Sequence, residues 1–258
     1  MLRAITIFAV SSMLCTMAAA QTPAEGSESK PIPRMPDGKP DFNGFFDLPY
    51  FPNMASGKEE TVPYTPAGRA AYLNHDAKDD PTANCWFPGV PRIMESPYPA
   101  QFVQTHDYII ILFEYMHTFR TIPLSGRPHP ADMTPAFMGD STGHWEGDTL
   151  VVDTSDLKDG HWTWLDTAGH QHSDKLHVVE KFQRTPDSIL YQFTVEDPVM
   201  YSKPWTFSRT FNPLKMIPGE PPLLEYSCSE NNRDLKHLIS TKPALNPPQR
   251  PAGGAPRR

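Results

Sequence analysis

The sequence predicts an all-β protein, either an antiparallel β-barrel or a sandwich, with one short helix. Segments rich in β-branched and aromatic residues recur at roughly ten-residue spacing, with turn residues between them. The chain also contains 30 prolines, which disfavour a helical bundle because proline interrupts helices. One segment alone combines a helix start signal with a run of helix-forming residues.

The N-terminus has the features of a cleaved secretory signal peptide, residues 1–20. Arg3 gives a charged start, an apolar run follows over 4–17, and Ala18 and Ala20 stand at the small-residue positions before the cleavage site. The apolar run is too short for a comfortable membrane span, and no later segment is long and apolar enough. We therefore expect an exported protein, periplasmic or secreted, without a membrane span.

Three regions are expected after the signal peptide. Residues 21–39 are polar and rich in proline, and we interpret them as a leader. Residues 40–242 are expected to form a single β domain, and residues 243–258 a disordered tail that cannot bury apolar surface. The net charge of −7 argues against a nucleic acid partner. The oligomeric state stays open.

The predicted helix begins after Thr65. Thr65 stands at the N-cap position and Pro66 at the first helical position, which is the usual place for proline in a helix. Helix-forming residues continue to about Leu73. A helix this short is expected to serve as a lid or plug on the β structure.

Most of the remaining chain has strand patterns. The clearest segments are 101–115, 117–124, 175–184, 188–198 and 203–212. The first two flank a tight connection near Tyr115–His117. The third and fourth are joined by Thr185–Ser188, where proline followed by aspartate favours a turn.

The stretch Gly143–Thr154, "GHWEGDTLVVDT", predicts a further hairpin. It places His144, Glu146 and Asp148 at alternate positions, which in an unbroken strand would put them on one face as a metal or acid–base site. We interpret "EGD" instead as a three-residue hairpin loop, because Gly147 is free to take positive φ. The three side chains are then expected not to share a face, and the motif to be structural.

Two cysteines remain after removal of the signal peptide, Cys85 and Cys228. In an oxidising compartment they most simply form one disulfide, which would close a very long loop. The alternative is a pair of buried free thiols.

Charged residues fall in phase with the apolar face of two strands. Glu180 alternates with Leu176, Val178 and Phe182, and Arg209 alternates with Trp205, Phe207 and Phe211. A buried carboxylate or guanidinium is costly when unpaired, so each needs a partner, and we predict an ion pair between Glu180 and Arg209.

Two interpretations of this polar set stay open. One is a structural ion pair across the barrel interior. The other is a ligand cavity in which Glu180 is a general acid or base, Arg209 orients it or stabilises an anion, and Tyr191 donates a hydrogen bond. The binding residues expected around this catalytic trio are Glu114, Arg120, Phe193, Trp205 and Phe207.

The histidines suggest a rival site. His170, His172 and His177 lie close together in "HQHSDKLH", and imidazole ligands in a β-rich exported protein suit a transition metal, as in cupin-type barrels. The spacing departs from the cupin pattern, which has a glutamate where His177 stands. In the strand His177 also falls on the opposite side from Glu180.

Several stretches together resemble a largely uncharacterised family of secreted bacterial β-proteins. They are "PDGKPDFNGFFDLPY", "GRPHP", "GDSTGHWEGDTLVVDT", "HSDKLHVVEKF" and "VEDPVMYSKPWTF", and the likeness covers about Pro36–Asn232. The family usually has Gly-x-Trp near its start, similar to the lipocalin strand signature, where this chain has Phe46. It usually has Cys-His-Glu near its end, where this chain has Cys228-Ser229-Glu230. The resemblance implies an exported β domain of calycin-like type and no particular reaction.

The sequence thus favours an exported β-barrel enzyme that acts on a small apolar or aromatic molecule by acid–base chemistry without a cofactor, such as an isomerase, lyase or cyclase. The first alternative is a carrier or binding protein with the same pocket. The second is an enzyme that depends on one transition metal held by the three histidines.

Overall fold

The computed structural model describes residues 30–228, and the predicted signal peptide and C-terminal tail lie outside this range. The described chain contains nine strands in one antiparallel sheet, in the order β4-β3-β2-β1-β9-β8-β7-β6-β5. The strands are β1 Gly44–Asp47, β2 Ala100–Gln104, β3 Tyr108–Phe113, β4 Thr118–Pro123, β5 Asp140–Glu146, β6 Thr149–Ser155, β7 His177–Arg184, β8 Ile189–Glu196 and β9 Trp205–Pro213.

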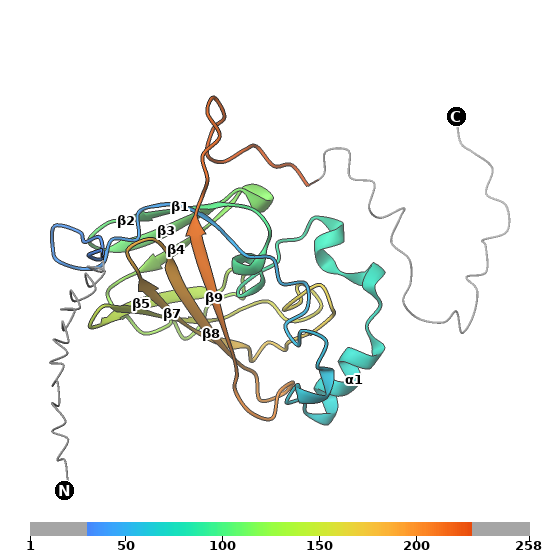
Figure 1. Cartoon of the computed structure of the whole chain (residues 1–258). Helices are drawn as coiled ribbons and strands as arrows, with labels where there is room; N and C mark the ends of the chain where they lie inside the picture. The colour runs from blue at the N-terminus through green and yellow to red at the C-terminus, as the bar shows by residue number, and fades with distance from the viewer. Residues whose placement is uncertain (1–29, 229–258) are drawn as a thin grey trace, which may run out of the picture. The chain divides into compact units, whose positions relative to one another are not determined.

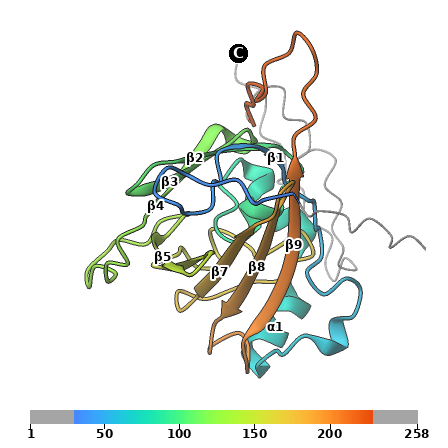
Figure 2. The ribbon, with the colours of Figure 1, turned by 60° about the vertical axis from the view of Figure 1, so that its left-hand side comes forward.

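The two edges of this sheet approach each other, so the sheet forms a nearly closed barrel (Figure 1). The backbone N–H of Gly126, just after β4, donates to the carbonyl of Gly143 on β5 at 3.0 Å. A Cβ on Gly143 would lie 3.0 Å from Ile122 of β4, so glycine permits this close approach. Figure 2 shows β7, β8 and β9 side by side in the opposite wall. The predicted all-β class is confirmed.

The single α-helix of the described residues is α1, Pro66–Asn74, as predicted. The Thr65 hydroxyl accepts a hydrogen bond from the N–H of Gly68 at 3.0 Å, which caps the helix. Gly68 is buried against β-domain backbone, because a Cβ there would lie 2.0 Å from the Met200 carbonyl oxygen. Five short 3₁₀ helices accompany it: η1 Glu59–Thr61, η2 Ala77–Asp79, η3 Pro81–Asn84, η4 Arg92–Glu95 and η5 Tyr115–His117. None of these helices is long and apolar enough to cross a bilayer within the described residues.

The barrel interior is filled by large side chains, many of them aromatic. The Tyr191 ring stacks on Phe193 and Phe211 with centroids 5.4 and 4.8 Å apart. Ile93 and Met94 of η4 are fully buried and belong to the same core. The other fully buried large residues are Phe42, Phe46, Phe102, Ile109, Ile111, Arg120 and Phe182. Strand alternation therefore produces a packed interior.

The hairpin between β5 and β6 differs from the prediction. Glu146 pairs with Thr149, so the loop has two residues, with Gly147 at φ +61° in the position where a type II′ loop has its glycine. The strand thus continues through Glu146, and His144 shares an exposed face with it at 3.5 Å between Nε2 and Oε1. The expectation that these two side chains diverge is wrong. Asp148 does turn away and binds Arg34 through two hydrogen bonds of 2.9 and 2.6 Å.

The predicted disulfide between Cys85 and Cys228 is present, with Cα atoms 5.5 Å apart. It joins the end of η3 to the C-terminal segment across a sequence separation of 143 residues. In the chain-entropy model a bridge of this span stabilises the fold by up to about 4–5 kcal/mol.

Candidate functional site

Glu180 lies in the barrel interior, but its partner is Arg120. The Nη1 of Arg120 on β4 donates to Oε1 of Glu180 on β7 at 2.9 Å, and Nη2 donates to Oε2. The Tyr191 hydroxyl donates to Oε1 at 2.8 Å. Glu180 is fully buried and Arg120 is 2 % exposed. The predicted ion pair between Glu180 and Arg209 is therefore wrong, although Glu180 does point inward as alternation predicts.

All three guanidinium nitrogens of Arg120 donate hydrogen bonds. Its Nε donates to the Ser141 hydroxyl at 3.0 Å and its Nη2 to the Thr154 hydroxyl at 2.7 Å. Burial lowers the pKa of Arg120, but attraction to Glu180 and the hydrogen bonds with it outweigh burial, so the pKa is raised overall. Burial, and then the charge of Glu180, raise the pKa of Tyr191 well above its ordinary value, so Tyr191 stays a hydrogen-bond donor.

This interior network has the properties of a structural ion pair. Both carboxylate oxygens of Glu180 are occupied by protein donors, and the surrounding core is packed. Breaking such a pair is costly because the remaining charge would be buried alone. A substrate that reached Glu180 would first have to displace Arg120 or Tyr191.

Arg209 occupies a different site, at the border of β9. The strand pairs with β1 only near its end, at Pro213 and Asn212, so the earlier part of β9 faces the chain that follows β1 and η4. The Arg209 Nε donates to Oε1 of Glu95 at 2.5 Å. Its Nη1 donates to the carbonyl of Ser208 at 3.0 Å. The Cζ of Arg209 lies 3.6 Å from the centroid of the Phe51 ring, a close cation–π contact.

Glu95 is a buried carboxyl group with a raised pKa. It is 3 % exposed, and its Oε2 has no hydrogen-bond partner among the described residues. Burial raises its pKa to about 7, while Arg209 lowers the value and Asp166 raises it further. Buried carboxyl groups with a pKa near neutrality are typical of functional sites. Glu95 could not be recognised from the sequence, because it lies in a short 3₁₀ helix after Pro91 and is not part of a periodic pattern.

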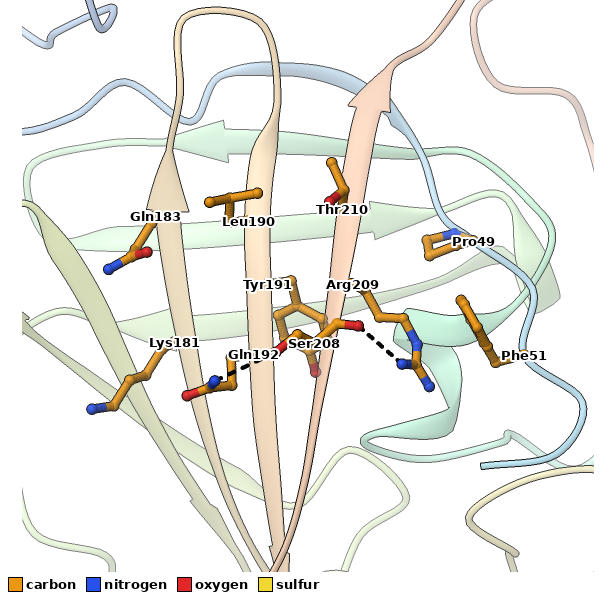
Figure 3. A pocket seen from close by; sticks show the side chains of 10 residues that line it. All are labelled: Pro49, Phe51, Lys181, Gln183, Leu190, Tyr191, Gln192, Ser208, Arg209 and Thr210. Carbon is orange, nitrogen blue, oxygen red and sulfur yellow. Dashed lines mark hydrogen bonds between the residues drawn. The ribbon is translucent and has the colours of Figure 1, made fainter. Parts of the chain in front are cut away.

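Arg209 also lines a groove of about 720 Å³ on the outer face of β7–β9 (Figure 3). Most of the lining projects outward from the three strands, and Pro49 and Phe51 form a wall beside β9. Figure 3 shows the Arg209 side chain turned toward Phe51. The lining residues are Pro49, Phe51, Lys181, Gln183, Leu190, Tyr191, Gln192, Ser208, Arg209 and Thr210.

The groove is basic although the chain is acidic. It contains two cationic residues, Lys181 and Arg209, and no carboxylate, whereas the chain has a net charge of −7. Lys181 forms no ion pair with any residue in 30–228. Tyr191 contributes to the groove only from behind, because its side chain is 1 % exposed and points into the core.

His170 lies in a second buried polar cluster. Its Nδ1 is 2.6 Å from Oδ2 of Asp166, and its Nε2 is 3.1 Å from Oε2 of Glu59. Burial lowers the pKa of His170, but both carboxylates raise it and the net shift is upward. The ring stacks on Tyr72 with centroids 5.0 Å apart. The cluster joins η1 to the loop before β7.

The three histidines predicted as metal ligands do not converge. His172 is 2 % exposed, its Nδ1 is 3.0 Å from the Ser173 carbonyl, and burial lowers its pKa. His177 starts β7 and its Nε2 is 2.6 Å from Oδ1 of Asp153. Within residues 30–228 no group of three or more His, Cys, Asp or Glu residues is arranged to hold a metal ion. The predicted metal site is therefore wrong. His170 and His172 lie in a loop, where closeness in sequence does not bring side chains together.

His177 belongs to a chain of alternating acidic and imidazole groups on the barrel surface. Oδ1 of Asp153 lies 3.0 Å from Nε2 of His129, and Nδ1 of His129 lies 2.7 Å from Oδ2 of Asp140. Arg127 holds Asp140 through hydrogen bonds of 2.9 and 2.5 Å. This chain attaches the segment between β4 and β5 to β6 and β7.

The remaining predicted binding residues are divided between two places. Phe193 is in the core, fully buried. Trp205 and Phe207 are half-buried on β9 with ring centroids 4.6 Å apart. Glu114 lies near η5, where its Oε2 accepts from the N–H of Leu224 at 2.8 Å. The Phe193 ring stacks on Phe207 with centroids 5.0 Å apart, so the three aromatic residues form one cluster. Glu114 is not part of this cluster, and the predicted set does not line the groove over β7–β9.

No family model, no curated protein and no solved structure matches this chain.

Proposed function

We propose that this protein is exported and binds a small molecule with an anionic group and an apolar or aromatic body in the groove over β7–β9. The observation that carries the proposal is the placement of Lys181 and Arg209 along a groove without acidic residues, in a chain of net charge −7. Cationic side chains in a concave site select anionic ligands and raise their association rate.

The groove also suits the rest of such a ligand. Its volume of about 720 Å³ lies in the range of ordinary ligand pockets. Phe51, Pro49 and Leu190 supply apolar surface, and Gln183 and Gln192 supply amide groups that fix orientation. A ligand here would contact the outer ends of these side chains and leave the barrel core intact.

One structural feature supports the exported location in this proposal. The disulfide between Cys85 and Cys228 is compatible with an oxidising compartment. Periplasmic or secreted localisation, which the signal-peptide pattern predicts, would expose the groove to small molecules of the cell surroundings.

An acid–base enzyme is the second candidate, and Glu95 favours it. A carboxyl group with a pKa of about 7 can accept or donate a proton near neutrality, and Arg209 connects Glu95 to the groove. The same role for Glu180 and Tyr191 stays a prediction, and it requires entry into a packed and hydrogen-bonded core. A metal-dependent enzyme has no support from the positions of the three histidines.

The test is a binding measurement by calorimetry with 2-naphthoate, with neutral 2-naphthamide as the matched ligand. We expect naphthoate to bind the mature protein more tightly than naphthamide, and Lys181→Gln to weaken naphthoate binding by about tenfold, as for loss of a charged hydrogen bond. Lys203→Gln, an exposed lysine outside the groove, is the control and should change nothing.

Equal binding of the two ligands, or an equal loss in both lysine variants, would refute the anion site. Conversion of a bound carboxylic acid by the wild type, with loss of conversion in Glu95→Gln, would favour the enzyme over the carrier.

A further inference from the structure

We propose that the groove binds its anionic ligand together with one proton, which is taken up by Glu95. This inference rests on the proposed anion-binding function and specifies how that site is regulated. It makes Glu95 a positioning residue that acts through Arg209, with affinity for anions that increases as the pH falls.

Glu95 and a ligand in the groove would share the guanidinium group of Arg209. The Nε edge of Arg209 binds Oε1 of Glu95 at 2.5 Å, while the same side chain lines the groove. Phe51 contacts both residues. The Cζ of Arg209 lies 3.6 Å from the centroid of its ring, and its backbone N–H donates to the backbone carbonyl of Glu95 at 3.3 Å. An anion in the groove would therefore attract the cation that now compensates Glu95.

Among the described residues, the Glu95 carboxyl group has no hydrogen-bond donor that could replace Arg209. Its side chain is 1 % exposed and its Oε2 has no partner among the described residues, so Arg209 is the main source of compensation for its charge. A second anion beside Arg209 adds repulsion to a carboxylate that is already desolvated. Protonation removes both costs, because a neutral carboxyl group needs far less compensation when buried.

Other titratable groups also face Glu95. Arg209 approaches from β9, Asp166 from the loop before β7, and Tyr191 from β8. Tyr191 stays protonated, because burial raises its pKa well above the ordinary value. Asp166 is held by His170 and by the N–H of Met54, so its charge adds to the repulsion at Glu95. Burial raises the pKa of Glu95 to about 7, which makes protonation accessible at neutral pH.

Coupling between anion binding and protonation of Glu95 determines how the affinity for the anion depends on pH. Below pH 6 Glu95 is already protonated, so binding takes up little or no proton. Above its pKa Glu95 is ionised in the free protein, and anion binding must be accompanied by uptake of up to one proton. The affinity then falls by at most about tenfold per pH unit, because a single proton is involved.

The experiment is calorimetric titration of the mature protein with 2-naphthoate at pH 6 and pH 8, each in two buffers of different ionisation enthalpy. The dependence of the observed heat on the buffer gives the number of protons taken up. We expect a value near zero at pH 6 and approaching one at pH 8. Glu95→Gln is expected to abolish the uptake and to bind naphthoate at pH 8 at least as tightly as the wild type.

Glu60→Gln is the matched control, because Glu60 is exposed and lies outside the groove, and it should retain the uptake. His170 also has a raised pKa, but it is unchanged in Glu95→Gln, so uptake that persists in this variant would overturn the inference. Equal uptake by the wild type at pH 6 and pH 8 would overturn it too, even if Glu95→Gln failed to fold. Absence of naphthoate binding at both pH 6 and pH 8 would instead refute the proposed function itself.

Discussion

Tyr191 and Arg209 stand directly opposite each other on β8 and β9, yet their side chains bind two different carboxylates. Tyr191 donates to Glu180 in the barrel interior, and Arg209 donates to Glu95 at the border of the sheet. Both residues follow the alternation of inward-facing positions. The two side chains therefore lie on the same face of the sheet, Tyr191 within the closed interior network and Arg209 at the sheet border, where it also lines the groove.

Replacement of Glu180 by glutamine should destabilise the protein and leave groove binding intact. The change removes the charge that compensates Arg120, and loss of one partner of a buried ion pair costs about 3–5 kcal/mol. Urea unfolding measures the free energy of unfolding, and Glu60→Gln provides the exposed control. A variant of unchanged stability that lost the conversion of a ligand would instead support the catalytic role predicted for Glu180.

Removal of the disulfide should lower stability without changing the fold. The double variant Cys85→Ser/Cys228→Ser loses a crosslink that constrains the unfolded chain, and we expect a loss of up to about 4–5 kcal/mol. Thermal unfolding of the oxidised wild type, the reduced wild type and the double variant makes the comparison. The reduced wild type should unfold at the same temperature as the double variant, and the oxidised wild type at a higher one. Equal unfolding temperatures for all three samples would contradict a stabilising role of the disulfide.

His129 should stabilise the protein at low pH and not at high pH. Burial lowers its pKa, but the hydrogen bonds with Asp140 and Asp153 outweigh burial, so the pKa in the folded protein is raised above 6.5. Its contribution is therefore complete below the unfolded value of 6.5 and is lost as the pH rises through the folded value.

The measurement is the difference in unfolding free energy between wild type and His129→Gln, from pH 5 to pH 9. The difference should be largest at pH 5 and should shrink at alkaline pH. A difference that stays constant across this range would show that packing, and not charge, explains the effect of His129.

Gly68→Ala should disturb the packing of α1 against Met200 and destabilise the protein. The added methyl would lie 2.0 Å from the Met200 carbonyl oxygen, so helix or loop must move, at about 1–3 kcal/mol. Helix propensity alone would favour alanine over glycine, so a net loss of stability would have to come from the contact with Met200. The reverse change at exposed Ala70 should cost about 1 kcal/mol from helix propensity alone. If Gly68→Ala stabilises the protein, α1 is not packed against Met200 as described.

The sequence predicted what local patterns determine. Alternation places Glu180 and Arg209 on the inward face, the capping signals place α1, and the two mature cysteines pair. These features depend on neighbouring residues or on simple counting.

The partners of the charged residues could not be predicted in this way. Arg120 meets Glu180 because β4 closes against β5, which brings together the two edges of a nine-stranded sheet. Glu95 meets Arg209 because β9 has a paired strand on its β1 side only at Asn212 and Pro213. Both contacts depend on how the barrel closes, and strand periodicity contains no information about closure.

The alternation of β7, β8 and β9 has a consequence for how this protein can change. Core residues such as Phe182 and groove residues such as Lys181 are adjacent in sequence but point to opposite sides of the wall. A library that varies the outward positions can therefore change the groove while the barrel core stays the same. The positions to randomise are Lys181, Gln183, Leu190, Gln192, Ser208 and Thr210. The surface of the groove can in this sense evolve independently of the residues that form the core.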